Sequence, residues 1–355
     1  MMKIRKYELA RAIDKAKGIV MKNNAFPALE CILIDGQSAV ASNTEITIEV
    51  KIEGSYGTSI LLPMRAFDMV KNLPDGELDI DQDPGSEVVT IKMEKLKSSF
   101  SSYHPDDFTL RKDRPEGEGL LLPGKELISA LSKVVFAADE ASVQMPIRGV
   151  NIKASGGVLA ITATDGHVLA YDEVIAHGIE DVNLIIPKKT VKKLIEMGMD
   201  DDIRITYDKN SAVFETAEYT IFTRLIAGNY LDVSRLLAGE SQLTSFRMNR
   251  KELQAALTRA NLCSTEERKP LVAHFTGGTV DISIAGNTSG YSEILEAQSD
   301  FTGEIRMGFN TKLLIDALKG YAGSYITLKI LKPSAPAFFS EEGSALKVMV
   351  LPVKI

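Results

Sequence analysis

The chain of 355 residues contains no tryptophan, two cysteines and four histidines. Cys31 and Cys263 stand alone, without the paired spacing of a zinc site or the density of a disulfide framework, so we expect both to be buried apolar residues. The histidines are far apart in the sequence and show no HExxH pattern. We therefore predict no metal site and no cofactor.

Long apolar runs are also missing, since no stretch approaches the roughly 18 residues that a membrane span needs. The start, Met1 to Lys6, leads into no signal-peptide core. With 45% hydrophobic and 25% charged residues, the composition is that of a soluble globular protein, and we expect it to be cytoplasmic with no membrane partner. The length fits two or three domains of about 100 to 150 residues.

An internal repeat organises the chain. The apolar spacing of an amphipathic helix occurs three times in one register, starting at Leu9, Leu127 and Leu253, each directly after a glutamate. In the third copy Asn249 precedes Glu252 by three residues, which is the pattern of a capping box. β-rich sequence then leads to an Asx-containing corner at Asn43, Asp165 and Asn287, with a separation of 122 residues each time. A period held this closely indicates repeated units.

A second helix follows in each unit, and its entry residue is Pro63, Pro187 or Asn310. The predicted second helices cover 64–72, 188–197 and 311–319, and each is followed by strands that alternate apolar and polar residues. The sequence thus predicts an α+β fold of three repeated domains, each with two helices on one side of antiparallel sheets. We place the domains at 1–119, 120–241 and 242–355.

Charge is distributed unevenly between helices and the rest of the chain. The predicted helices, 7–20, 64–72, 125–136, 188–197, 250–262 and 311–319, hold 16 Lys or Arg against 7 Asp or Glu, so they carry +9 and the remainder carries −16 of the total −7. A basic helical side would attract phosphates without reading bases. The alternative is that Lys and Arg are simply good helix formers on solvated faces.

Several segments together resemble one family. These are the three repeats, the Thr164 to His167 corner, the segment Phe222 to Gly228 and the ending Val350 to Ile355. The chain resembles, over its whole length, the bacterial DNA polymerase III beta subunit, the sliding clamp. The resemblance implies a non-catalytic processivity factor, a head-to-tail homodimer whose six domains form a ring around duplex DNA. Such a ring tethers the DNA polymerase III catalytic subunit and is opened by a clamp loader.

The resemblance also implies which residues meet DNA and which meet the second copy. Sequence-independent DNA contacts are expected at Lys22, Arg65, Lys71, Lys188, Lys189, Lys192, Lys193 and Arg259. The four lysines of 188–193 lie on neighbouring helical rows, so they cannot all point the same way. The dimer contact is expected to join Phe100, Ser102 and Tyr103 to Leu262 and Cys263. For Phe100, ordinary core packing is the alternative.

By the same resemblance, partners that carry a clamp-binding motif insert short peptides into a groove between the second and third domains. The residues expected to line it are Ile147, Thr164, Gly166, His167, Val168, Leu169, Leu231, Arg235, Leu236, Met349, Val350, Leu351, Pro352 and Val353. The run from Met349 to Val353 could equally be a last core strand, and the two interpretations are compatible. The family usually has Arg, Pro and Tyr where Val168, Leu231 and Val233 stand, which leaves the peptide preference open.

Two other functions remain as alternatives. One is a clamp-fold protein specialised for repair or for a mobile element. The other is a hydrolase that uses Asp165 and His167, although no nucleophile, phosphate loop or GxSxG pattern accompanies this pair. We therefore predict no catalytic residues.

Overall fold

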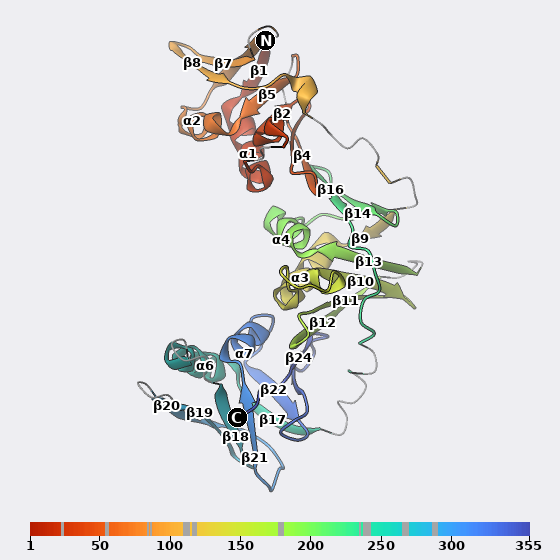
Figure 1. Ribbon diagram of the computed structural model, residues 1–355, viewed down its shortest axis with the longest axis vertical. Coiled ribbons are helices and arrows are strands. Elements are labelled where there is room, and N and C mark those ends of the chain that lie inside the picture. The colour runs from red at the N-terminus through yellow and green to blue at the C-terminus, as the bar shows by residue number, and fades with distance from the viewer. Residues whose placement is uncertain are drawn as a thin grey trace. The chain divides into compact units, whose positions relative to one another are not determined.

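The computed structural model describes residues 1–22, 25–53, 57–83, 85, 87–108, 114–115, 119–176, 181–233, 236, 243–264, 270–285 and 290–355. They fall into two compact units, of which the first comprises Met1–Lys125 with Glu196–Leu225 and the second Glu126–Ile195 with Ile226–Ile355. Figure 1 labels their elements. Within the described ranges no helix is long and apolar enough to cross a membrane.

The first unit contains two sheets and two α-helices. A four-stranded sheet has the order β1-β6-β7-β8, and an eight-stranded sheet has the order β5-β2-β3-β4-β16-β15-β14-β9. The strands are β1 (Met2–Arg5), β2 (Cys31–Ile34), β3 (Ser38–Ser42), β4 (Ile46–Lys51), β5 (Ile60–Pro63), β6 (Glu77–Asp83), β7 (Val88–Met93), β8 (Leu96–Ser101), β9 (Leu120–Leu122), β14 (Ile203–Tyr207), β15 (Ser211–Glu215) and β16 (Tyr219–Arg224). The helices are α1 (Lys6–Ala16) and α2 (Phe67–Asn72).

The second unit repeats the pair of sheets and has four α-helices among its described residues. Its eight-stranded sheet has the order β13-β10-β11-β12-β24-β23-β22-β17, and its four-stranded sheet has the order β20-β19-β18-β21. The strands are β10 (Gly149–Ser155), β11 (Val158–Thr164), β12 (Val168–Ile175), β13 (Val182–Pro187), β17 (Thr244–Asn249), β18 (Leu271–Phe275), β19 (Thr279–Ala285), β20 (Gly290–Glu296), β21 (Ile305–Phe309), β22 (Tyr325–Ile330), β23 (Ala337–Ser340) and β24 (Lys347–Val350). The helices are α3 (Gly124–Val134), α4 (Lys188–Met197), α6 (Arg250–Ser264) and α7 (Thr311–Leu318).

Each eight-stranded sheet joins strands from two sequence repeats. In the first unit β4 pairs antiparallel with β16, and Ile48 lies opposite Ile221. In the second unit β12 pairs antiparallel with β24, and Leu169 lies opposite Met349. We call these two pairings the first and the second seam. They make the sheet continuous across residues that are more than 150 positions apart in the sequence.

The predicted helix register is confirmed. The apolar positions that repeat in α1, α3 and α6 are buried, as Leu9, Leu127 and Leu253 show. Asn249 Oδ1 accepts hydrogen bonds from Lys251 N at 3.0 Å and Glu252 N at 3.2 Å, so Asn249 caps α6. Asn310 caps α7 in the same way. By contrast, Pro63 and Pro187 are the last residues of β5 and β13 and not members of the first helical turn.

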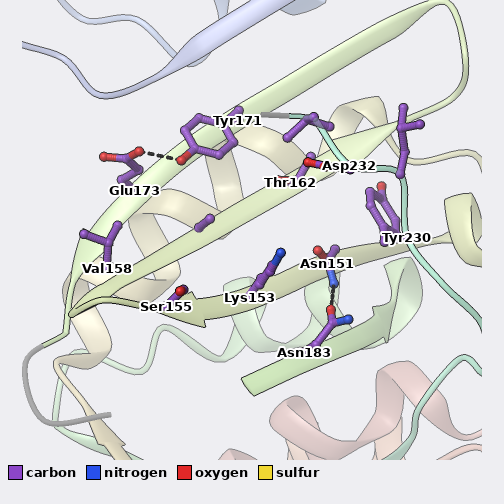
Figure 2. A pocket seen from close by; sticks show the side chains of 13 residues that line it. Asn151, Lys153, Ser155, Val158, Thr162, Tyr171, Glu173, Asn183, Tyr230 and Asp232 are labelled. Carbon is purple, nitrogen blue, oxygen red and sulfur yellow. Dashed lines mark hydrogen bonds between the residues drawn. The ribbon is translucent and has the colours of Figure 1, made fainter. Parts of the chain in front are cut away.

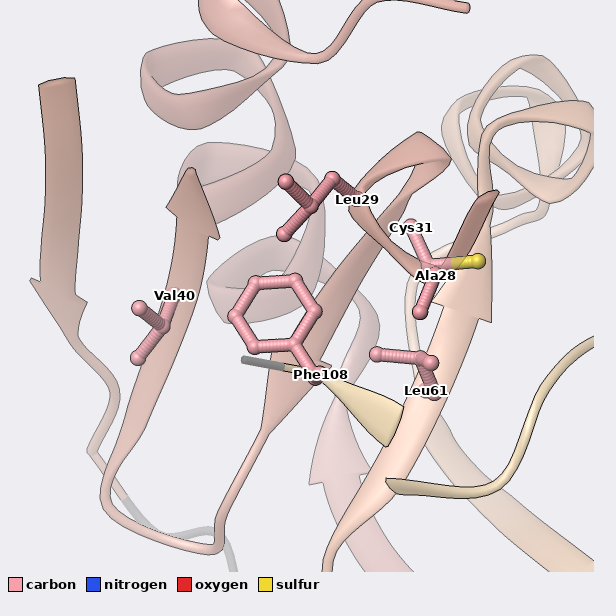
Figure 3. Close-up of a cluster of buried hydrophobic side chains, with 6 residues drawn as sticks. All are labelled: Ala28, Leu29, Cys31, Val40, Leu61 and Phe108. Atoms are coloured by element: carbon pink, nitrogen blue, oxygen red, sulfur yellow. The ribbon is translucent and has the colours of Figure 1, made fainter. Parts of the chain in front are cut away.

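One face of β2, β3 and β5 carries an apolar cluster (Figure 3). We call this face, to which Cys31, Val40 and Leu61 belong, the outward face of the sheet, and we use the same term for the corresponding face of the second unit's large sheet. A 3₁₀ turn at Pro27–Glu30 contributes two members of the cluster, and another at Pro105–Asp107 directly precedes Phe108. The cluster consists of Ala28, Leu29, Cys31, Val40, Leu61 and Phe108. Burial raises the pKa of the Cys31 thiol to about 11, so this cysteine behaves as an apolar residue. The matching expectation for Cys263 is wrong, because it is only partly buried near the end of α6.

Candidate functional site

The corner before β12 is held by its own side chains. Asp165 Oδ1 accepts hydrogen bonds from the backbone N–H groups of His167 and Val168, both at 2.7 Å. Thr164 Oγ1 donates to Val168 O at 2.7 Å and accepts from Gly166 N at 3.0 Å. Gly166 has φ +88°, a left-handed conformation that glycine adopts without strain. The turn fixes the start of β12 and leaves the His167 side chain exposed.

The chain's C-terminal segment runs beside this corner. Beyond the ladder of the second seam, Leu351 N donates to His167 O at 2.8 Å. Two residues later Val353 N donates to Gly308 O at 2.8 Å, which attaches the segment to β21. The run from Met349 to Val353 therefore starts as a strand and continues along the corner. This course is compatible with both interpretations of the sequence, a last core strand and a wall of the groove.

Apolar side chains gather on one face of the second seam. Leu169 and Met349 pack with Val233 and Phe338, and Tyr171, Leu243 and Leu351 border this cluster. We call it the seam cluster. Alternate strand residues point to opposite faces, so Val168 and Val350, which are 1% and 0% exposed, lie on the other face. These two support the candidate groove from behind and do not line it.

The other expected groove residues differ in exposure. Leu231 is 54% exposed, and Leu236 and Val353 are also exposed, so all three are accessible to a partner. Ile147 and Pro352 are half-buried. Arg235 lies outside the described residues. The candidate groove thus has a buried apolar floor and a rim of exposed apolar side chains, an arrangement suited to a few anchor side chains of a peptide.

Sequence reasoning missed three residues of this site, since Phe338 belongs to the seam cluster and Tyr171 and Leu243 border it. Val233, which also belongs to the cluster, was noted only as a departure from the family. The alternation of β12 could have placed Tyr171 beside Leu169, because residues i and i+2 of a strand share a face. No local pattern connects Phe338 with them, since only the strand order brings β23 next to β24.

A second missed feature is an ion pair on the helix side of β12. Asp172 is 2% exposed, and its Oδ2 lies 2.9 Å from Lys133 Nζ on α3. Asp172 Oδ1 also accepts a hydrogen bond from Glu173 N at 3.0 Å. The pair ties α3 to the strand that carries the seam cluster.

The corner lacks the geometry of an acid–base pair. The Asp165 carboxylate accepts backbone N–H groups, and its hydrogen bond with His167 runs to the amide and not to the ring. Among the described residues no group of three or more His, Cys, Asp or Glu side chains could hold a metal ion. Asp165 thus serves the turn, where it orients the backbone at the start of β12.

The lysines of α4 point in different directions. Lys193 is 4% exposed, so its side chain is not accessible to a phosphate, contrary to the expected DNA contact. Lys188 Nζ donates to Phe136 O at 3.3 Å and to Ala138 O at 2.5 Å. Burial, and then the charge of Lys192, lower the pKa of Lys188. Lys189 and Lys192 are exposed, and Lys192 lies 3.5 Å from Glu140.

The remaining residues predicted to contact DNA fall into two groups, those with exposed side chains and those paired with a carboxylate. Lys22 and Arg65 are exposed. Lys71 forms an ion pair with Asp14, which also pairs with Lys17. Arg259 forms a bidentate pair with Glu293 on β20. Lys22, Arg65 and Lys189 therefore have the most accessible charges, whereas Lys71, Lys192 and Arg259 would have to exchange a carboxylate for a phosphate.

The residues expected at the dimer contact lie near the ends of two four-stranded sheets. Phe100 is half-buried on β8, the last strand of its sheet, and Tyr103 is exposed just after it. Leu262 is exposed at the end of α6, which contacts β20, the end strand of the other sheet. Ser102 does not fit, because it is buried and its hydroxyl donates to Leu61 O.

Comparison with known proteins gives one consistent family. Models of the DNA polymerase III beta subunit match in order: the N-terminal domain at residues 1–110, the central domain at 121–232 and the C-terminal domain at 236–354. The beta sliding clamp of Bacillus subtilis is 26% identical over 375 residues, which cover 99% of this chain and 98% of that protein.

Solved structures agree in fold. A putative DNA polymerase III beta subunit from Eubacterium rectale has a TM-score of 0.91 at 25% identity and covers 100% of this chain and 99% of its own. The DNA polymerase III subunit beta from Pseudomonas aeruginosa has a TM-score of 0.91 at 21% identity, with 100% of both chains covered.

Proposed function

Since the chain belongs to the DNA polymerase III beta subunit family, the sliding clamps, we propose that it encircles duplex DNA and tethers a replicative polymerase. The observation that carries this function is the ordered match of the three domain models over nearly the whole chain. The protein is a non-catalytic subunit that acts in DNA replication. It acts in the cytoplasm, where the DNA is.

The proposed assembly is a head-to-tail homodimer of three-domain chains, with domains at 1–119, 120–241 and 242–355. The end strands β8 and β20 support it, because each presents an unpaired backbone edge and an adjacent apolar side chain, Phe100 or Leu262. A heterologous contact that closes under two-fold rotation pairs both of these edges, so neither remains a template for open-ended association.

A closed ring needs only weak phosphate contacts, because it cannot leave DNA without opening. Lys22, Arg65 and Lys189 supply them first, and Lys71, Lys192 and Arg259 supplement them. Contacts of this kind read no bases, and they weaken as salt rises because phosphate binding releases counterions. Sliding along the duplex follows from the absence of base-specific anchors.

Partner proteins bind in the candidate groove over the seam cluster. The occupants are peptides of the DNA polymerase III catalytic subunit, of the clamp loader and of other proteins that carry a clamp-binding motif. A tethered polymerase has a high effective concentration at the primer end, which raises its processivity.

Retention on DNA tests the proposed function. The protein is loaded by a clamp loader onto nicked circular DNA, separated from free protein by gel filtration, and incubated before and after the circle is linearised. It should remain on circles and leave linear DNA. Equal loss from both forms, or a monomer by light scattering under native conditions, would contradict the proposal.

Lys189→Glu should weaken loading and reduce its dependence on salt, because a phosphate contact is lost. Lys332→Glu, an exposed lysine on a loop of the second unit, is the matched charge control. Unchanged loading of Lys189→Glu would remove α4 from the DNA-facing surface.

A further inference from the structure

A pocket of about 340 Å³ lies on the outward face of the second unit's large sheet (Figure 2). Its floor consists of outward residues of neighbouring strands, among them Asn151 and Lys153 on β10 and Ala160 and Thr162 on β11. The segment from Tyr230 to Val233 forms one wall. Most of the side chains that line the pocket carry polar groups, in contrast to the seam cluster beside it.

The corresponding sheet face of the first repeat is filled by apolar side chains, whereas that of the second repeat contains the pocket. In the first, Leu33 lies opposite both Val40 and Leu61, and Phe108 closes the apolar cluster over that face (Figure 3). In the second, Asn151 holds the place of Leu33 and Thr162 that of Val40. Tyr230 stands 122 residues after Phe108, the same period as the corners. Polar side chains thus replace the packing that fills the first copy.

One end of the pocket is a donor site. Lys153 and Asn183 lie directly opposite each other on β10 and β13, so their side chains are neighbours on the outward face. Asn183 Oδ1 already accepts a hydrogen bond from Asn151 Nδ2 at 2.7 Å, and this bond does not use the amide N–H₂ of Asn183 (Figure 2). An ammonium and an amide N–H₂ side by side suit a carboxylate.

Two carboxylates also line the pocket, Asp232 on the Tyr230 to Val233 wall and Glu173 on β12, away from Lys153. Glu173 on β12 lies across Ala160 from Lys153, and it accepts a hydrogen bond from the Tyr171 hydroxyl. Burial raises the pKa of Tyr171, so this hydroxyl keeps its proton and remains a donor. The ammonium group of the pocket is therefore at β10, beside Asn183 of β13, whereas its carboxylates belong to β12 and to the Tyr230 to Val233 wall.

The pocket is continuous with the candidate groove. Tyr171 and Val233 line the pocket and also border or belong to the seam cluster, and Leu231 stands at the rim of both. A chain segment whose apolar side chains occupy the seam cluster can continue over the same sheet face into the pocket without leaving the surface.

We propose that this pocket is a second subsite for the partner peptide and binds a carboxylate side chain between Lys153 and Asn183. The inference rests on the proposed function, because it takes the groove as the anchor site. Peptides with an acidic residue beside the apolar anchor should then bind more strongly than peptides without one.

Sheet geometry sets where the acid should stand in the peptide. From Leu169 to Lys153 the path crosses two strand spacings and four residues along the strand, roughly 10 Å by 13 Å, or about 16 Å in all. An extended peptide spans this with about five residues at roughly 3.3 Å each.

Synthetic peptides test the proposal. Fluorescein-labelled peptides carry adjacent Leu and Phe as the anchor and a glutamate five residues before or after it, and matched peptides carry glutamine there. Fluorescence anisotropy measures their binding to the full-length protein, to Lys153→Glu and to the control Lys332→Glu. We expect the glutamate peptide of one orientation to bind more tightly to the unsubstituted protein, and Lys153→Glu to weaken it about tenfold. The glutamine peptide should change less than twofold.

A peptide with lysine in place of the glutamate should bind the Lys153→Glu variant more tightly than it binds the unsubstituted protein. A merely structural role of Lys153 would not produce this reversal. Equal affinity of glutamate and glutamine peptides in both orientations, or equal weakening of both by Lys153→Glu, would overturn the subsite. If the unsubstituted protein binds no anchored peptide at all, the proposed groove fails, and the subsite fails with it.

Discussion

The two seams use the same backbone device. At the first, Asn43 Oδ1 accepts hydrogen bonds from Glu45 N and Ile46 N at 3.1 and 2.9 Å, as Asp165 Oδ1 does at the second. Arg224 N donates to Glu45 O at the first seam, where Leu351 N donates to His167 O at the second. The joining of repeats is therefore common to both places.

The side chains on the seams differ. On the outward face of the first seam Glu49 forms an ion pair with Arg114 at 2.9 Å, whereas the second seam carries the apolar pair Leu169 and Met349. On the helix side the first seam has buried Val50 where the second has Asp172. Since the ladder does not depend on these side chains, one seam can remain purely structural while the other gains an apolar surface for partners.

The ion pair on the helix side gives the largest expected effect. Lys133→Met leaves the Asp172 carboxylate buried without its partner, and we expect a loss of about 3 kcal/mol in the free energy of unfolding. Lys15→Met at the corresponding place in α1 loses a hydrogen bond to Met197 O and a contact with the Tyr219 ring, about 1 kcal/mol. Urea unfolding measures both. Adding Asp172→Val to Lys133→Met should recover most of the lost free energy of unfolding. Equal losses for Lys133→Met and Lys15→Met would contradict the proposed difference between the two seams.

The seam cluster gives the next effect. Met349→Asp places a carboxylate in an apolar floor, so peptide binding should fall by at least about thirtyfold. Thr220→Asp, on β16 of the first seam, is the control and should leave binding unchanged. Leu351→Ala should weaken binding less, because it truncates a side chain at the border of the cluster. Peptide anisotropy decides, and circular dichroism verifies that each variant is folded.

The corners should respond alike in stability and differently in binding. Asp165→Ala and Asn43→Ala each remove an acceptor of two backbone N–H groups, so each should lower the free energy of unfolding by about 1.5 kcal/mol. Asp165→Ala should also weaken peptide binding a few-fold, because the corner borders the groove. Weaker binding by Asn43→Ala as well would mean that the effect spreads through the fold and is not local.

The smallest effect concerns one backbone angle. Thr44 has φ +74° where Gly166 has +88°, and a side chain in this region is strained. Thr44→Gly should stabilise the first corner by about 0.5 kcal/mol, since relief of strain exceeds the entropy cost of glycine, and Gly166→Thr should destabilise the second by about 1 kcal/mol. Thermal unfolding of both variants tests the sign, and a destabilised Thr44→Gly would show that the threonine is not strained.

The sequence was informative where a pattern is local. The predicted range 188–197 coincides with α4, because apolar spacing and the preceding proline both lie within a few residues. It did not show that Lys193 is buried while Lys189 is exposed, because packing against the sheet decides which helical row faces inward. Nor did it place Val168 behind the groove, since the corner's geometry sets which face each residue of β12 takes.

Asp172 and Lys133 illustrate the limit most clearly. They lie 39 residues apart on a strand and a helix, and neither belongs to a motif. The adjacent charges of Asp172 and Glu173 on β12 are visible in the sequence, but the partner of Asp172 could be found only from the three-dimensional arrangement.

The second seam also has a consequence for how the chain could be divided into two polypeptides. The hydrogen bonds between β12 and β24 join strands that precede and follow residues 234–242 in the chain. A polypeptide ending at 233 and another starting at 243 would carry complementary strand edges, and the corner and Leu351 would still meet through backbone groups alone. Covalent continuity between the second and third repeats would then be dispensable for assembly, and the two halves could be co-expressed as separate proteins that reconstitute one subunit.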